Sequence, residues 1–397
     1  MAIKHEVFWR NPSYKGYSKL NKDIECDYLI VGGGISGVSL AYFLSKFKAG
    51  KVVLIEKNQI ASGATGRAAG ILSIRGEADF HDFVKRLGRK NAIIYWDEIH
   101  KTLKLLRKII EEEKIDCDAE LEDTLYCGFK HKAYNDIKEE YSYEEVENDS
   151  KMLMGEFLKK EINTNLYNHA LLSKDHGLSV NPLKLTQNLS LIAKKYGALI
   201  YENTRFFGHE KNVARTNGGK IKFKKIIIAI DAQHPSQEIL RMKTSLIVTR
   251  PLTKEESLIT GLVKKKIFHT SSYKKKIFWD NKENYEYGKL TKDNRLLLGF
   301  GWVRINKDAE DKLHLPHIAK IRTFLKKLFP YLDLDIEYAW SGSFGVTKNY
   351  EPLIKSKGNN LFIAGAATQP GCVMASHYLA HKLTNKKSSL DKIFKLK

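Results

Sequence analysis

Three glycines, Gly32, Gly34 and Gly37, stand between an apolar segment and a helix-like segment. In this Gly-x-Gly-x-x-Gly spacing the first glycine permits a tight turn, the second lets a pyrophosphate reach the backbone, and the third lets the helix pack closely on the strand. The helix would begin near Ile35 and Ser36, and its free amides and positive dipole end would face the phosphates. The spacing therefore predicts that a dinucleotide binds at this turn.

An acidic residue supports the same interpretation. A second apolar segment, residues 51–55, leads into Glu56 and Lys57. Glu56 follows the last glycine by about 20 residues, where a carboxylate accepts hydrogen bonds from ribose hydroxyls. A glycine pattern alone is often only a glycine-rich turn. Here strand, glycines, helix, strand and acid follow one another, and that order predicts a βαβ unit over about 26–57.

A second glycine-rich segment, residues 60–72, follows this unit. Such small residues suit a backbone that runs close to a ligand. Arg67 lies between Gly66 and Gly70, so we expect its side chain near the same ligand. The residues of this segment that we expect to contact the dinucleotide are Ser62, Gly63, Thr65, Gly66, Arg67, Ala69, Gly70 and Ile71.

Length and charge restrict the class of protein. A chain of 397 residues usually forms two domains or one large composite domain. The net charge of +21 suggests either a polyanionic partner, such as RNA or a membrane surface, or lysines on a solvated surface. We favour the second explanation, because the lysines are scattered and no RNA-binding signature accompanies them. No run of about 18 apolar residues predicts a membrane span, and the charged N-terminus does not resemble a signal peptide.

The cysteines and histidines indicate no other chemistry. The four cysteines show no Cys-x-x-Cys spacing or disulfide framework, which favours a reducing, cytoplasmic location. No cluster of His, Cys and Asp has the spacing of metal ligands, and a Gly-x-Ser-x-Gly motif is absent. His81 and His377 are possible acid–base groups, but a lone helical histidine is more often structural.

Periodicity predicts the elements that must position these residues. Helical spacing of apolar residues is found over 91–115, 183–197, 316–329 and 372–384. Strands are predicted over 121–130, 198–202, 225–230 and 361–367, with a hairpin turn at Gly218 and Gly219. Four strand-like runs without intervening helices predict an antiparallel sheet: 244–250, 276–280, 285–290 and 295–301.

The order of the elements predicts two interleaved domains in an α/β protein. Elements typical of a dinucleotide fold occur early, in the middle and at the end of the chain. We therefore predict a Rossmann-like binding domain assembled from 1–92, 174–236 and 338–397, with an N-terminal arm packed on it. The segments 93–173 and 237–337 would form an inserted α+β substrate domain built on the antiparallel sheet.

The order of motifs resembles the glycine oxidase, sarcosine oxidase and D-amino acid oxidase group of FAD-dependent oxidoreductases, over nearly the whole chain. The N-terminal tryptophan and the Thr-Arg-Pro-Leu run look most like the γ-glutamylputrescine oxidoreductase branch, which acts on amines. The motifs that carry the resemblance are Ile30–Gly37 with Glu56, Ala61–Arg67 with Gly70, Gly177 with Asn181–Pro182, Thr249–Leu252, Tyr285-x-Tyr287 before Arg295–Gly299, Trp340–Thr347 with Pro352, and Ala364–Gly371.

This resemblance implies a non-covalent FAD in an extended conformation. The first three glycines would receive its pyrophosphate, Glu56 its adenosine ribose, and Ser62–Arg67 would line the pyrophosphate and ribityl region. Lys57 is also expected among the residues that bind the cofactor. The segment 365–371 and the helix after it would approach the flavin ring. The implied reaction is hydride transfer from the carbon beside an amine nitrogen to flavin N5, followed by hydrolysis of the imine. The further residues implied at the cofactor are Ala229, Gly365, Gly371, Cys372 and Val373.

Some positions differ from the family pattern. Glycine oxidases bind the substrate carboxylate with an arginine at the position of Phe344, and some amine-oxidising relatives have an arginine at that of Ser343. The oxygen-activating lysine of sarcosine oxidases is replaced by Leu297. No cysteine lies beside Thr347, where sarcosine oxidases attach the flavin, so we expect non-covalent FAD. The substrate and the electron acceptor, oxygen or another, stay open.

Two residues are candidates for work on the substrate. Tyr287 matches a substrate-facing tyrosine of glycine oxidase, and otherwise it would be an ordinary aromatic strand residue. Arg75 lies near the place where sarcosine oxidases bind a carboxylate, and otherwise it would be a surface arginine. Two alternatives to amine oxidation stay open. One is a flavoenzyme acting on a modified tRNA base, suggested by the basic charge, and the other is a catalytically silent FAD-binding subunit.

Overall fold

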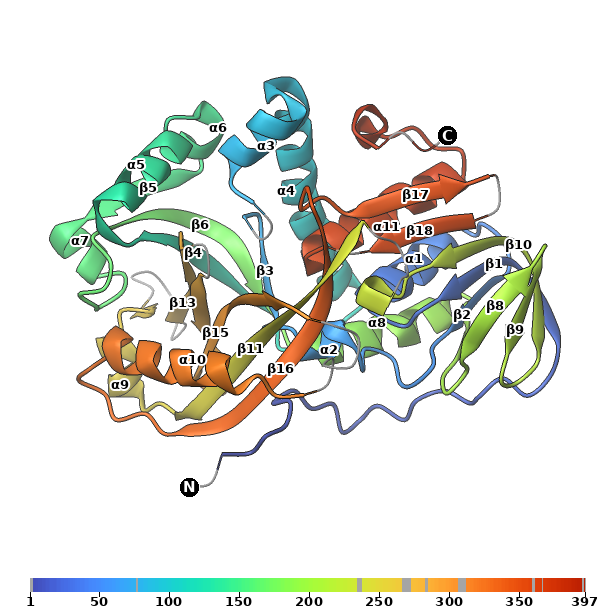
Figure 1. The fold of residues 1–397 in the computed structure, drawn as a ribbon, viewed down its shortest axis with the longest axis horizontal. Coiled ribbons are helices and arrows are strands. Elements are labelled where there is room, and N and C mark those ends of the chain that lie inside the picture. Colours follow the sequence, from blue (N-terminus) through green and yellow to red (C-terminus); the bar gives the residue numbers. More distant parts are fainter. Residues whose placement is uncertain are drawn as a thin grey trace.

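The computed structural model describes residues 3–75, 78–233, 238–265, 273–282, 285–305, 312–358, 361–365, 367–394 and 396. Two large sheets lie side by side in Figure 1, one on the right with the strands β1, β2 and β10, the other on the left with β4, β6 and β16. The chain passes between the two sheets several times. This architecture agrees with the predicted α/β class.

The first sheet is the nucleotide-binding type that the sequence predicts. Its order is β17-β18-β10-β1-β2-β7, and the strands from β18 to β7 are parallel. The carboxyl-terminal parts of β1 and β10 and the whole of β2 are apolar and buried. Helices cover one face of the sheet, and apolar residues such as Leu20, Phe206 and Ala214 cover the other. The bounds are β1 Ile24–Val31, β2 Val52–Ile55, β7 Leu199–Tyr201, β10 Lys220–Ile228, β18 Leu361–Gly365 and the antiparallel β17 Leu353–Lys357, with the hairpin β8 Phe206–Glu210 and β9 Val213–Thr216 joined to β10.

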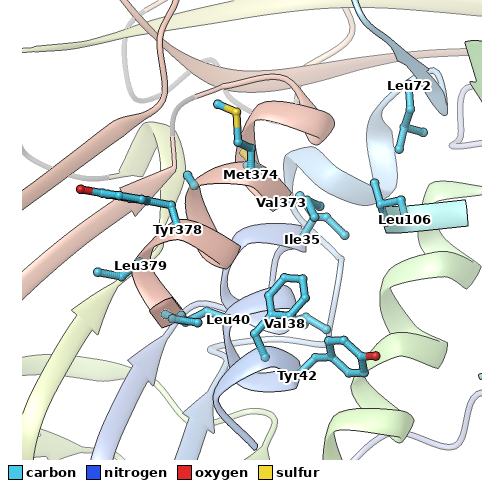
Figure 2. Packing of buried hydrophobic residues seen from close by; sticks show 14 of the residues in the cluster. Ile35, Val38, Leu40, Tyr42, Leu72, Leu106, Val373, Met374, Tyr378 and Leu379 are labelled. Atoms are coloured by element: carbon cyan, nitrogen blue, oxygen red, sulfur yellow. The ribbon is translucent and has the colours of Figure 1, made fainter. Parts of the chain in front are cut away.

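The helix after the glycine turn is the centre of the main apolar core. Helix α1 (Ile35–Lys46) packs against α11 (Gln369–Leu383), and Figure 2 shows Val373 of α11 close to Ile35 of α1. The Ser376 hydroxyl also donates to the Ser36 carbonyl at 2.8 Å, which fixes the two helices at the start of α1. Helices α4 (Arg89–Glu112) and α8 (Pro182–Lys195) complete this layer. The glycine turn is therefore built on a rigid, buried support.

The second sheet is large and mostly antiparallel. Its order is β16-β11-β15-β14-β13-β4-β6-β3, and β4 and β13 are parallel neighbours, which corrects the prediction of a purely antiparallel sheet. Because β4 comes early and β13 late in the chain, local patterning does not reveal this pairing. The bounds are β3 Ile71–Ser73, β4 Glu120–Gly128, β5 Ser150–Met154, β6 His169–Ser179, β11 Ile239–Pro251, β12 Val263–Lys265, β13 Tyr273–Asp280, β14 Glu286–Leu290, β15 Arg295–Arg304 and β16 Ile336–Thr347.

Shorter helices surround this second sheet. Helix α10 (Leu315–Leu328) packs its apolar side, including Ile321 and Phe324, on β11 and β15. In the described parts of the chain, no helix is both long and apolar enough for a membrane span. The other helices are α2 Ala64–Arg67, α3 Phe80–Leu87, α5 Lys130–Tyr141, α6 Glu144–Glu147, α7 Gly155–Lys159 and α9 Lys254–Ile259, with the short turns η1 Asp231–Gln233 and η3 Ser389–Lys392.

The N-terminal arm and one predicted boundary differ from expectation. The arm contacts both sheets, since Lys4 pairs with Tyr338 of β16 while the Tyr14 hydroxyl donates to Glu202. Strand β16 belongs to the second sheet along its whole length. Its residues up to Thr347 therefore pair with the part that we predicted to be the substrate domain, although we placed residues 338–347 in the binding domain.

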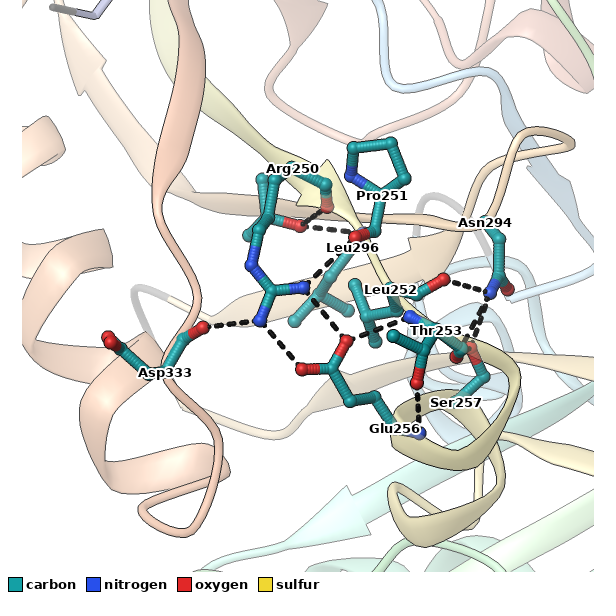
Figure 3. Close-up of polar contacts among 10 residues, drawn as sticks. Arg250, Pro251, Leu252, Thr253, Glu256, Ser257, Asn294, Leu296 and Asp333 are labelled. Atoms are coloured by element: carbon teal, nitrogen blue, oxygen red, sulfur yellow. Dashed lines mark hydrogen bonds and ion pairs between the residues drawn. The ribbon is translucent and has the colours of Figure 1, made fainter. Parts of the chain in front are cut away.

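The Thr-Arg-Pro-Leu run forms a structural clamp. Figure 3 shows the Arg250 guanidinium donating to both Glu256 oxygens at 2.6 and 2.8 Å, and to the Asp333 carbonyl at 2.6 Å. Glu256 also closes a capping box with Thr253 at the start of α9. These contacts join the end of β11 to α9 and to the loop before β16. None of these four residues lines the cavity described below.

Glu256→Gln is expected to lower the melting temperature most at neutral pH. The hydrogen bond from Arg250 lowers the pKa of Glu256 from 4.5 to about 2. The charge of Glu256 therefore contributes stability above pH 4.5 that is lost as the pH falls toward 2. We expect a loss of about 1–2 kcal/mol at pH 7. Thermal melts at pH 7 and in acid measure this loss, and Glu255→Gln, at an exposed position, is the control. If the difference in melting temperature between Glu256→Gln and the wild-type protein does not shrink in acid, the lowered pKa of Glu256 is contradicted.

Candidate active site

The glycine turn has the geometry of a cradle for a phosphate. Gly32 has φ +114°, and a Cβ there would overlap the Ala229 carbonyl. A Cβ at Gly37 would overlap the Gly32 carbonyl, so this glycine lets α1 start directly on the strand. A Cβ at Gly34 would meet only the Thr65 hydroxyl, at 3.2 Å. The first-turn amides of α1 have no partners within the helix, so the turn fits a pyrophosphate.

The acidic residue after β2 organises the same turn. Glu56 accepts hydrogen bonds from the Gly33 amide at 2.7 Å and the Asn58 amide at 2.9 Å. The carboxylate thus lies directly beside the glycine turn and keeps lone pairs for ribose hydroxyls. Lys57 points elsewhere, because its ammonium donates to Gln233 at 2.6 Å. Of these two residues predicted to bind the cofactor, the geometry favours Glu56.

The glycine-rich segment 62–71 runs from the turn into the cavity. Ser62 and Gly63 are exposed, whereas Thr65 and Gly66 are buried, and the Thr65 hydroxyl accepts from the Ile35 amide at 3.0 Å. This bond ties the segment to the start of α1. Four of the predicted residues line the cavity: Arg67, Ala69, Gly70 and Ile71.

Two tryptophans from opposite ends of the chain hold this segment. The Trp9 indole donates to the Ala68 carbonyl at 2.7 Å, and the Trp340 indole donates to the Arg67 carbonyl at 2.8 Å. Both rings are buried, with 6% and 3% exposure. The Arg67 guanidinium donates to the Ser341 carbonyl at 3.2 Å. Strand β16 and the N-terminal arm therefore fix two consecutive peptide groups beside the cavity.

Lys289 fixes the end of the same segment. Its ammonium, fully buried, donates to the Gly70 carbonyl at 2.7 Å and lies 5.5 Å from the centre of the Trp9 ring. Position 70 requires a glycine, because its φ is +67° and a Cβ there would overlap the Val180 carbonyl. Burial lowers the pKa of Lys289 to about 8, although nearby Glu122 favours its charge. Sequence reasoning did not single out this lysine, because its partners are backbone carbonyls.

The start of α11 forms another wall. Gly365 has φ +139° and ends β18, and Thr368 then caps α11, its hydroxyl accepting from Gly371 at 3.5 Å. The helix begins at Gln369, a few residues before the predicted start. Cys372 and Val373 are buried, and the Cys372 thiol donates to the Ala367 carbonyl at 3.4 Å. The cavity is bordered here by Ala367, Thr368, Gln369 and Pro370, so a helix N-terminus opens onto it.

A cavity of about 540 Å³ lies between this helix start, the glycine-rich segment and the second sheet. A row of aromatic side chains crosses the sheet beneath it: Tyr126 of β4 pairs with Trp279 of β13, which pairs with Tyr287 of β14. More aromatic residues come from the strand ends and the loops near them. The aromatic residues that line the cavity are Tyr126, Trp279, Tyr285, Tyr287, Trp302, Phe344 and Tyr350.

Tyr287, the predicted substrate-facing residue, lies in this row. Its hydroxyl is 3.3 Å from the Thr244 hydroxyl, and its ring occupies the space above Gly299, where a Cβ would overlap it. Burial raises the pKa of Tyr287 to about 12, so the phenol stays protonated at neutral pH. The glycine at position 299 therefore leaves the space that the Tyr287 ring occupies.

Gly299→Ala is expected to move the Tyr287 ring and reduce turnover while the chain still folds. An added methyl group overlaps the ring, and overpacking of this kind costs about 1–3 kcal/mol. We expect kcat/KM to fall by about 10-fold or more. Steady-state kinetics measure the change, and the melting temperature of the variant separates a local movement of the ring from a loss of stability. Unchanged kinetics with a normal melting temperature would count against a role for Tyr287.

Arg75 also lines the cavity but is already paired. Its guanidinium lies 3.4 Å from Glu140 and 3.3 Å from the Ser173 hydroxyl, and 5.6 Å from the centre of the Trp96 ring. Glu140 also accepts from the amides of Phe80 and His81. Arg75 therefore compensates a buried carboxylate that caps α3, and a role in binding a substrate carboxylate stays a prediction.

His377, by contrast, lies outside the cavity. Its ring is 4.7 Å from Phe43 and 4.3 Å from His381, between α11 and α1. Burial lowers its pKa to about 4, so it is neutral at pH 7. This supports the structural role that a lone helical histidine usually has.

Comparison with known proteins identifies the type of site. A sequence profile of the family described as "FAD dependent oxidoreductase" matches residues 27–384. The chain is 28% identical over 367 residues to γ-glutamylputrescine oxidoreductase of Escherichia coli (strain K12), an alignment that spans 88% of this chain and 80% of that protein.

Solved structures show the same fold. Glycine oxidase from Geobacillus kaustophilus superposes with a TM-score of 0.76 at 17% identity, over 92% of this chain and 96% of that one. L-Proline dehydrogenase from P. horikoshii gives a TM-score of 0.74 at 20% identity, over 94% and 96% of the two chains. Both superpositions extend over more than nine-tenths of this chain, so the chain shares its fold with these structures.

Proposed function

The chain belongs to the FAD-dependent oxidoreductase family, and on that premise we propose that it oxidises the C–N bond of an amine. The observation that carries the proposal is the aromatic cavity between the glycine-rich segment and the start of α11. The similarity to γ-glutamylputrescine oxidoreductase supports an amine as substrate. In this proposal the bound FAD supplies the hydride acceptor.

We propose that the cofactor is held by the glycine turn at one end and by the cavity at the other. Gly32, Gly34 and Gly37 would receive the pyrophosphate, and Glu56 the adenosine ribose. The start of α11 would stabilise negative charge on the flavin ring. No cysteine or histidine is among the described residues that line the cavity, which supports non-covalent binding.

The protein side chains would orient the amine and exclude water from it. Hydride transfer needs an unprotonated amine and an aligned C–H bond more than a strong base. The phenol of Tyr287, which is protonated at neutral pH, would donate a hydrogen bond to the substrate or contact it as part of the cavity wall. The surrounding aromatic rings would shield the reacting carbon from water. The resulting imine would hydrolyse after release into water.

Anaerobic mixing with an amine panel tests the proposal. The purified protein, loaded with FAD, should lose its absorbance in the 450 nm region of oxidised flavin with at least one primary or secondary amine, and should release an aldehyde or ketone. Hydrogen peroxide release on admission of air then distinguishes an oxidase from a dehydrogenase. Bleaching by tRNA alone, or by no compound, would reject amine oxidation in favour of the alternatives.

A further inference from the structure

One side of the cavity is acidic, in a chain whose net charge is +21. Three of the described lining residues are aspartates: Asp79, Asp82 and Asp280. Asp79 accepts a hydrogen bond from the Tyr126 hydroxyl at 2.7 Å, and the Tyr126 and Trp279 rings stack 6.1 Å apart. A carboxylate and two aromatic faces thus meet at one place on the wall.

The neighbouring cations are already engaged by other carboxylates. Arg75 lies against Glu140, as described above. Lys282 lies 3.1 Å from Asp280 and also pairs with Glu286, so two carboxylates share one ammonium there. His81 lies between Glu140 and Asp82, at 3.3 and 3.4 Å. Among the described residues, Tyr126 donates a hydrogen bond to the carboxylate of Asp79, and a ring nitrogen of His81 lies within 4.8 Å of that carboxylate.

The energetic state of Asp79 fits an incomplete site. Burial, and then the charge of Glu140, raise the pKa of Asp79 to about 7. The charges of Arg75 and His81 offset only part of this rise, so the charged form of Asp79 stays costly and a further ammonium nearby would stabilise it. Aromatic faces attract ammonium groups as well, and Tyr126 and Trp279 lie beside this carboxylate.

We infer that the substrate carries a second cationic group, so that it is a diamine or polyamine chain whose distal ammonium binds at Asp79, Tyr126 and Trp279. The inference rests on the proposed function. The distal ammonium takes no part in the reaction; it positions the chain so that the reacting amine lies farther along the cavity. A substrate carboxylate is disfavoured, because Arg75 and Arg67 both have partners.

Matched substrates test this assignment in the FAD-loaded protein. Linear α,ω-diamines and n-alkylamines of equal chain length are compared by steady-state kinetics, with the diamines expected to have the higher kcat/KM. Asp79→Asn should raise KM for the diamines by about 10- to 100-fold and leave the alkylamines unchanged. Asp97→Asn is the control, because it removes the same charge from an exposed site on α4 outside the cavity.

Equilibrium binding gives a readout independent of turnover. A bis(trimethylammonium)alkane serves as the probe, because its quaternary nitrogens have no lone pair and it is therefore not oxidised as an amine. Calorimetry should show that the probe binds the wild-type protein and Asp97→Asn with equal affinity. Its affinity for Asp79→Asn should be lower by about the same factor as the expected rise in KM. If Asp79→Asn lowers the activity on both amine classes equally, or leaves the binding of this probe unchanged, the inference is overturned while amine oxidation stands. If no amine bleaches the flavin, the proposed function fails. The calorimetry then tests by itself whether a cation binds at Asp79.

Discussion

Gly37→Ala is expected to yield a protein that purifies without bound FAD. The added methyl group would overlap the Gly32 carbonyl, so the turn must move away from α1. The amides that would face the pyrophosphate move with it, and each hydrogen bond to a charged phosphate oxygen that is lost costs about 1.5–3 kcal/mol. The measurement is the absorbance of the purified protein near the flavin band, followed by titration with FAD.

Gly63→Ala is the matched control for this substitution. Gly63 belongs to the second glycine-rich segment, but no atom lies within 4 Å of an added Cβ and its φ is −85°. This variant should retain FAD and the yellow colour. If Gly37→Ala also binds FAD with unchanged affinity, the glycine turn does not hold the pyrophosphate and the proposed cofactor position is wrong.

The binding half of the fold could be predicted because its signals are local. The glycines, the apolar strands and Glu56 lie within one βαβ unit, and the structure brings them together at the start of α1. Asn181 and Pro182 likewise predict the start of α8, where the Asn181 side chain accepts from the Lys184 amide. The spacing of residues predicts these elements because the residues of each motif are close in sequence and contact one another in the structure.

The substrate side could not be predicted to the same extent, because its residues meet through long-range pairing. Tyr126, Trp279 and Tyr287 form one row only after β4 pairs in parallel with β13. Asp79 looks like an ordinary residue before a helix, and its burial beside Glu140 is visible only in three dimensions. A period-2 aromatic pattern marks these strands but does not tell which of them become neighbours.

The role of the two indoles that hold the glycine-rich segment 62–71 cannot be predicted, for a related reason. The sequence places Trp340 in a motif and Trp9 in an arm, but nothing in it shows that the two indoles donate to the consecutive carbonyls of residues 67 and 68. Buried backbone carbonyls need partners. Here the partners come from segments separated by most of the chain.

Trp340→Phe is therefore expected to weaken FAD binding without unfolding the protein. Phenylalanine keeps most of the apolar ring but leaves the Arg67 carbonyl without this donor, a loss worth about 1–3 kcal/mol. FAD affinity should fall by about 5- to 100-fold if the rigidity of segment 62–71 depends on this hydrogen bond. Fluorescence titration of the apoprotein with FAD measures the loss. Trp96→Phe is the control, because the Trp96 indole nitrogen is buried without a hydrogen-bond partner in the described structure.

Combining Trp340→Phe with Trp9→Phe tells how the segment is anchored. The two acceptor carbonyls are adjacent, so release of one peptide group should already loosen the other. The second substitution should then cost less than it does alone, with a coupling of about 0.5–3 kcal/mol between them. Strictly additive losses would mean that each indole acts on its own carbonyl. In that case the arm and β16 would hold the segment independently of each other.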